Sequence, residues 1–135
     1  MTYYINMLTI LQINNILDVS LKRDRYTKSI YTMIDNFFSE NDVFERDSII
    51  ITLIYLQRYK DSNCSINNKN IRDLLRTCLI LSNKFICDFQ ILGSGPLENH
   101  VLDKIKWNLY VDNEEFEHVK KISQTNFNVE YILSY

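Results

Sequence analysis

The fold is decided by one stretch of sequence, Asn70-Ile-Arg-Asp-Leu-Leu-Arg-Thr-Cys-Leu-Ile-Leu-Ser-Asn-Lys-Phe-Ile-Cys-Asp88. Its apolar residues recur at spacings of three and four, the pattern of a helix face. Ile80 and Leu81 lie off that face, so the helix is apolar around much of its circumference and belongs inside a bundle with neighbours on several sides. Near its end, Lys84 must reach solvent, pair with a carboxylate or meet a partner protein.

Length and composition indicate one soluble, helical domain spanning residues 1–135. Of the 135 residues, 46% are hydrophobic and 24% are charged, as in ordinary globular proteins. Only two glycines and one proline are present, which leaves little material for hairpins and tight turns. The formal net charge of −2 provides no general basic field, so we expect neither nucleic acid nor an acidic membrane surface as partner.

The cysteines and the apolar runs indicate the cellular compartment of the protein. Cys64, Cys78 and Cys87 are odd in number and irregularly spaced, which is typical of reduced thiols, and the helical pattern places Cys78 in the core. The longest apolar run, Ile49 to Leu56, is too short to span a bilayer, and no signal-like segment opens the chain. We therefore expect a cytoplasmic or nuclear protein.

The same periodicity predicts helices on both sides of the organising stretch. They cover residues 3–21, 24–39, 42–59, 96–109 and 112–122, with one last short helix within 127–135. The run from Ile49 to Leu56 also fits a buried strand, but its length and acidic start favour a helix. Pro96 suits a first helical position. Cap-like pairs precede three of the helices; they are Asp42 with Glu45, Asn70 with Asp73, and Asp112 with Glu115.

No set of residues has the spacing of an enzyme or metal site. His100 and His118 lie far apart and belong to no metal-binding motif, so both are expected at the surface. Gly93-Ser-Gly95 has no Gly-Lys-Ser/Thr after it and is expected to be a turn. Nothing assembles a nucleophile, a base and an oxyanion site. The sequence therefore favours a non-enzyme without metal or cofactor.

Lys84 and Glu98 are the charges that remain to be explained, and they allow two interpretations. In the first, they are solvated or form an internal ion pair worth about 0–1 kcal/mol if exposed. In the second, both stand at an interface and bind backbone groups of a partner. Apolar bulk beyond what two helices need surrounds them, as in an interface hot spot. These apolar residues are Leu81, Phe85, Leu102, Trp107 and Leu109.

Four segments resemble a cyclin box. Leu74–Phe85 resembles the third cyclin helix, which usually ends Leu-Ala-Ser-Lys-Phe/Tyr, and Leu97–Leu109 is similar to the Met/Leu-Glu-x-x-x-Leu helix after it. Leu53–Tyr59 resembles the end of the second helix, commonly Leu-Asp-Arg-Phe/Leu. Tyr110-Val-Asp-Asn-Glu-Glu-Phe116 is similar to Val-Ser-Pro-Glu-Glu-Phe of the P-type, phosphate-response cyclins. The match covers about residues 25–122.

The resemblance implies an all-α fold: a five-helix cyclin box with an extra N-terminal helix and a short C-terminal helix. It also implies a regulatory subunit that binds the αC helix of a cyclin-dependent kinase, activates it, and works as a heterodimer with it. In that family a Lys and a Glu bind backbone beside αC, and these roles fall to Lys84 and Glu98. The positions that hold αC match Leu81, Phe85, Leu102, Trp107 and Leu109.

The chain departs from the family pattern in several places. Tyr26 to Phe38 carries no Met-Arg-x-x-Leu-x-x-Trp motif, so a docking patch for Arg-x-Leu substrates is not implied. Gln57 stands where Asp is usual, which implies a weaker internal ion pair with the first helix. The loop from Asp88 to Leu97 is shorter than in P-type cyclins. The alternative function that stays open is a cyclin-fold scaffold for a non-kinase, transcription-related partner.

Overall fold

The computed structural model describes residues 10–22, 24, 25, 27, 30, 32–34, 36, 48–87 and 96–122. All regular structure in these ranges is helical, so the predicted all-α class is confirmed there. The elements are α2 (Ile10–Leu17), α4 (Ser48–Asp61), α5 (Ile71–Cys87) and α6 (Pro96–Lys104), and residues 113–122 form a further helix. None of the described helices has the length and apolar character required to cross a membrane.

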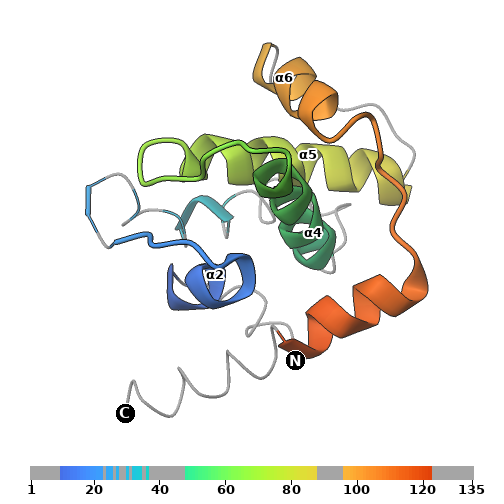
Figure 1. Cartoon of the computed structure of the whole chain (residues 1–135), viewed down its shortest axis with the longest axis horizontal. Coiled ribbons are helices and arrows are strands. Elements are labelled where there is room, and N and C mark those ends of the chain that lie inside the picture. Colours follow the sequence, from blue (N-terminus) through green and yellow to red (C-terminus); the bar gives the residue numbers. More distant parts are fainter. Residues whose placement is uncertain are drawn as a thin grey trace.

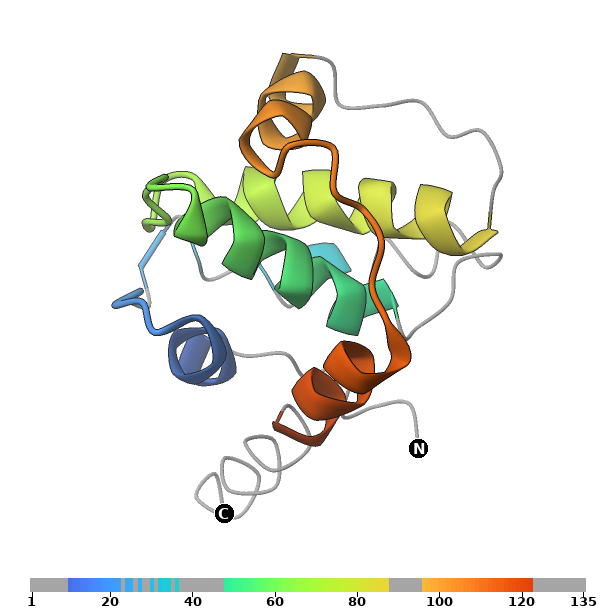
Figure 2. The ribbon, with the colours of Figure 1, turned by 45° about the vertical axis from the view of Figure 1, so that its right-hand side comes forward.

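Helix α4 is the centre of the described part of the molecule. Every residue from Ser48 to Leu56 is buried, so the isoleucine-rich run is surrounded on all sides and the alternative of a strand is wrong. Figures 1 and 2 show α4 between α2 and α5, and α4 also contacts α6. The organising stretch, α5, is instead exposed along one face, at Arg72, Asp73 and Arg76. The helix with neighbours on most sides is therefore α4, and α5 is its main packing partner.

The α4–α5 contact includes small polar residues. Thr52 and Ser82 are both fully buried, and their hydroxyl oxygens lie 3.2 Å apart. Each hydroxyl also bonds a carbonyl of its own helix, that of Ser48 at 2.8 Å and that of Leu79 at 2.8 Å. Each hydroxyl has one proton, so the Thr52 and Ser82 hydroxyls have two protons between them for these three contacts. Short side chains at this position allow the two helices to approach closely.

The start of α5 differs from the predicted cap. Asn67, not Asn70, takes the capping position: its Oδ1 accepts the Asn70 backbone N–H at 3.1 Å, and the Asn70 side chain accepts the Asn67 N–H at 2.9 Å. This reciprocal exchange is a capping box built from two asparagines. Asn70 still directly precedes Ile71, the first residue of α5, but its side chain pairs with Asn67 and not, as predicted, with Asp73.

Two helices end earlier than their apolar periodicity predicts. Helix α2 stops at Leu17 rather than at residue 21, because Asp18 adopts a left-handed conformation with φ of 54° and the Val19 N–H bonds the Asn14 carbonyl at 3.3 Å. This is a Schellman end without glycine. The Asn14 side chain then exchanges two hydrogen bonds with the backbone of Leu21. Helix α6 stops at Lys104 in the same way, and residues 105–109 are not helical.

Other predicted elements are confirmed where they are described. Residues 30, 32–34 and 36 are helical, within the predicted 24–39, and Pro96 is the first residue of α6. Asp112 caps the helix at 113–122, since its Oδ1 accepts the Glu115 N–H at 2.8 Å. The cap at Asp42 and Glu45, the turn at residues 93–95 and the short helix within 127–135 lie outside the described residues.

Candidate functional site

Lys84 and Glu98 form an ion pair between two helices. The Lys84 ammonium lies in the last turn of α5, and the Glu98 carboxylate lies in the first turn of α6, 2.8 Å away. Each charge suits the dipole of its own helix end. The side chains are 31% and 14% exposed. Two residues that are 14 positions apart in sequence are thus joined where solvent still reaches the ammonium.

Lys84 keeps bonding capacity for a further group. An ammonium has three N–H donors, and a carboxylate offers about four acceptor positions. Within the described part of the chain, one Lys84 donor is used by Glu98. The Lys84 side chain is 31% exposed, so solvent reaches the ammonium. The internal ion pair, which belongs to the first of the two interpretations, is therefore formed, and its formation does not use up Lys84.

The apolar residues assigned to the site divide into a buried and an exposed group. Leu81 and Leu102 are 2% and 5% exposed and belong to the core, so they present no surface in the free chain. Leu109 is partly buried against that core. Phe85 and Trp107 are exposed, the latter by 62%. Tyr110, which the sequence analysis did not single out, is also exposed.

Trp107 is held by a strained end of α6. The Trp107 N–H bonds the Leu102 carbonyl at 2.8 Å and the Lys106 N–H bonds the Asp103 carbonyl at 3.1 Å, which is a Schellman motif. Both Lys106 and Trp107 have φ of 58°. A left-handed conformation costs a non-glycine residue about 1–2 kcal/mol, and it is a clear outlier for a bulky side chain.

Relieving this strain is expected to stabilise the chain. Position 106 is where glycine usually ends a helix, so Lys106→Gly should raise the free energy of unfolding by about 1 kcal/mol. Lys104→Gly, two residues earlier and still helical, should lower it by about as much. Urea unfolding of the two variants checks the opposite signs. Two changes of the same sign would contradict the role given to the Lys106 backbone.

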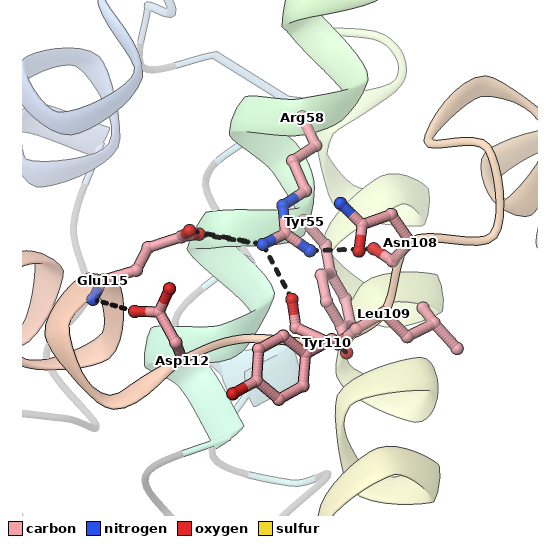
Figure 3. A network of polar contacts seen from close by, with 7 residues as sticks. All are labelled: Tyr55, Arg58, Asn108, Leu109, Tyr110, Asp112 and Glu115. Atoms are coloured by element: carbon pink, nitrogen blue, oxygen red, sulfur yellow. Dashed lines mark hydrogen bonds and ion pairs between the residues drawn. The ribbon is translucent and has the colours of Figure 1, made fainter.

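A network of polar contacts fixes the segment between α6 and the helix at 113–122 (Figure 3). The Arg58 guanidinium of α4 donates to the carbonyls of Asn108 at 2.8 Å and Tyr110 at 2.9 Å. The Tyr55 hydroxyl donates to the intervening Leu109 carbonyl at 2.8 Å. Two side chains one turn apart on α4 thus hold three consecutive carbonyls.

Charge and burial strengthen this network. Arg58 also donates to Glu115, at 3.0 Å to one carboxylate oxygen and 3.3 Å to the other. Burial raises the pKa of the Tyr55 phenol, and the Arg58 charge lowers it in part, so Tyr55 stays a donor at neutral pH. Sequence reasoning missed these roles because the partners lie about fifty positions away in sequence. The only signal was Arg58 itself, a cation directly after a buried helix segment.

A groove of about 450 Å³ lies between α2, α4 and the helix at 113–122. Leu53, Ile54 and Val119 contribute to its apolar lining. The Gln57 amide donates to Asp61 at 2.9 Å on the same helix, so Gln57 makes a local contact. Arg58 and Glu115 satisfy each other. The lining thus offers few convergent groups for a small ligand.

Both histidines and Cys78 lie where the sequence predicted. His100 and His118 are both exposed, and the Tyr59 hydroxyl lies 3.0 Å from the His100 Nε2. Cys78 is a free thiol inside the core, where burial raises its pKa to about 12. Among the described residues, no three His, Cys, Asp or Glu side chains are grouped so as to hold a metal ion.

Comparison with known proteins returns no relative. The chain matches no protein-family model, no curated protein and no solved structure.

Proposed function

We propose that this chain is a cyclin-like regulatory subunit that binds a cyclin-dependent protein kinase through its αC helix and activates it. The five-helix cyclin box, the position of the kinase surface and the activating role are all part of this proposal. The cyclin contributes no catalytic group. Its binding free energy favours the active conformation of the kinase.

The observation that carries the proposal is the Lys84–Glu98 pair. Lys84 ends the segment that resembles the third cyclin helix, and Glu98 begins the segment that resembles the next one. Their 2.8 Å contact joins the two most specific positions of the resemblance at one partly exposed place. The carboxylate orients the ammonium, and the ammonium keeps donors for a kinase backbone carbonyl.

The exposed aromatic residues add independent support. Phe85 follows Lys84 directly, and Trp107 is exposed on a backbone with a left-handed φ of 58°. Strained conformations concentrate at functional positions, and aromatic residues beside placed charges are common at interface hot spots. In this proposal, Leu81 and Leu102 support the surface from the core, while Phe85, Trp107 and Leu109 contact αC.

The mechanism follows from a two-state kinase. The αC helix would dock on the surface around Lys84 and turn inward, so that the kinase's own Lys–Glu ion pair forms and its activation loop opens. A chain that binds both kinase states equally would shift nothing. Activation therefore requires that the surface fits the inward position of αC better than the outward one.

The proposal predicts a specific loss of kinase binding in the double variant Lys84→Ala/Glu98→Ala. The double variant removes both charges of this partly exposed pair together, so neither charge is left without the other and the variant should fold. Loss of hydrogen bonds to kinase backbone should lower kinase capture by about tenfold or more. Wild type and variant are used as baits in extract of the cells that make the protein. Mass spectrometry and phosphorylation of histone H1 quantify the captured kinase.

The matched control is Arg72→Ala/Asp103→Ala. It removes one cation from α5 and one anion from α6, both exposed, and leaves the net charge unchanged. We expect it to capture as much kinase as wild type, and circular dichroism should show that both variants are folded. A wild-type bait without any kinase would contradict the proposal and favour the scaffold alternative. Equal kinase on all three baits would remove Lys84 and Glu98 from the interface.

A further inference from the structure

Side chains of α4 bond the backbone of residues 108–110, which follow Trp107. Figures 1 and 2 show the segment between α6 and the helix at 113–122 running past α5 without regular structure of its own. A segment of this kind needs side chains or water to satisfy its carbonyls. Arg58 takes those of Asn108 and Tyr110, while Tyr55 takes that of Leu109. The conformation of residues 108–110 therefore depends on Arg58 and Tyr55, which are not part of the proposed kinase surface.

The guanidinium is suited to this task and an ammonium is not. Arg58 presents two separate nitrogens in one plane, so Nη1 reaches one carbonyl while Nη2 reaches another and also the Glu115 carboxylate. A lysine ammonium is a point charge on a flexible stem and cannot reproduce this fork. Figure 3 shows the guanidinium between Glu115 and the Asn108–Tyr110 backbone.

We propose that Arg58 is a positioning residue for the candidate kinase surface: it fixes residues 108–110 and thereby holds Trp107 and Leu109 ready for docking. This inference rests on the proposed function for the identity of the partner. Ordering even a few residues at the moment of binding costs free energy that a preorganised surface does not lose. Release of the segment should therefore weaken binding although no contact residue has changed.

The test compares Arg58→Lys with Glu115→Gln in the full chain. Arg58→Lys keeps a cation near Glu115 but gives up at least one carbonyl. Glu115→Gln removes the anion and leaves both carbonyl contacts, so it is the matched control. Amide ¹⁵N order parameters of residues 107–111 should stay at about 0.85 in wild type and in Glu115→Gln. In Arg58→Lys they should fall below about 0.6. The order parameters of α5 report whether the fold is intact.

The second readout is the kinase captured from the same cell extract, measured by histone H1 phosphorylation. We expect about tenfold less kinase with Arg58→Lys and an unchanged amount with Glu115→Gln. Tyr55→Phe, which loses the Leu109 contact alone, replaces Arg58→Lys if that variant does not fold, with a smaller loss in the same direction.

Each of the remaining outcomes would contradict either the inference or the proposed function. Unchanged order parameters in Arg58→Lys would overturn the positioning role. Lowered order parameters with unchanged kinase capture would separate the segment from the kinase surface and overturn the inference. A wild-type bait without kinase would overturn the proposed function, whereas lowered order parameters would still establish that Arg58 holds the segment.

Discussion

Ser82→Leu is expected to lower the free energy of unfolding by about 3 kcal/mol, because it forces three extra carbons into a fully buried part of the α4–α5 contact. Ser82 is fully buried and faces Thr52 at 3.2 Å, so no direction is open for a larger side chain without moving a helix. Helix α4 is buried on all sides over Ser48–Leu56, which leaves it little room to shift. Urea unfolding followed by circular dichroism measures the loss.

Ser82→Ala is the control for this prediction. It removes the hydroxyl without adding volume, and Thr52 keeps its bond to the Ser48 carbonyl, so no buried group is left unpaired. The expected cost is about 1 kcal/mol or less. If alanine costs as much as leucine, the hydrogen bond and not the volume would dominate, and the steric account of the contact would be wrong.

Alkaline pH is expected to destabilise the fold through Cys78. Its pKa rises from an ordinary 9.0 to about 12 in the folded chain, with burial as the cause. Between these values the unfolded chain loses the thiol proton and the folded chain keeps it. The stabilisation is therefore complete below pH 9 and is lost as pH rises, by about 1.4 kcal/mol per pH unit. The buried Tyr55 phenol adds a loss of the same sign at higher pH.

Urea unfolding at pH 8, 9 and 10 tests this prediction against Cys78→Ala. The variant lacks the thiol, so its free energy of unfolding should fall less steeply between pH 9 and 10 than that of wild type. The small cavity that alanine leaves lowers stability equally at each pH and does not change the slope. Identical slopes in the two proteins would show that Cys78 is not responsible.

The helices were predictable from sequence because apolar spacing reports directly on burial. The pattern in 70–88 and the run from Ile49 to Leu56 gave both long helices, and Asp112 gave a correct cap. Helix ends were less predictable. Leu109 continues the apolar spacing of α6, but the backbone at Lys106 turns left-handed. No glycine stands at this position to indicate the helix end in the sequence. Periodicity records which side chains are buried and says little about where a helix stops.

The candidate site was predictable only in part. Family resemblance singled out Lys84 and Glu98, and the structure brings them into contact. Arg58 was not singled out, because its partners are backbone carbonyls, and a carbonyl leaves no mark in an amino-acid sequence. Burial divided the apolar set as well: Leu81 and Leu102 share the spacing of contact residues but lie in the core. Spacing alone does not separate a residue that lines a surface from one that supports it.

The short connection between α4 and α5 has a consequence for how the chain reaches its fold. Only residues 62–70 separate the two helices, and the Asn67–Asn70 box already directs the chain into α5. The entropy lost on closing a loop grows with its length, so this pair closes at low cost. Helices α4 and α5 also pack together more extensively than any other pair of the labelled helices. Low contact order in the central pair favours rapid folding.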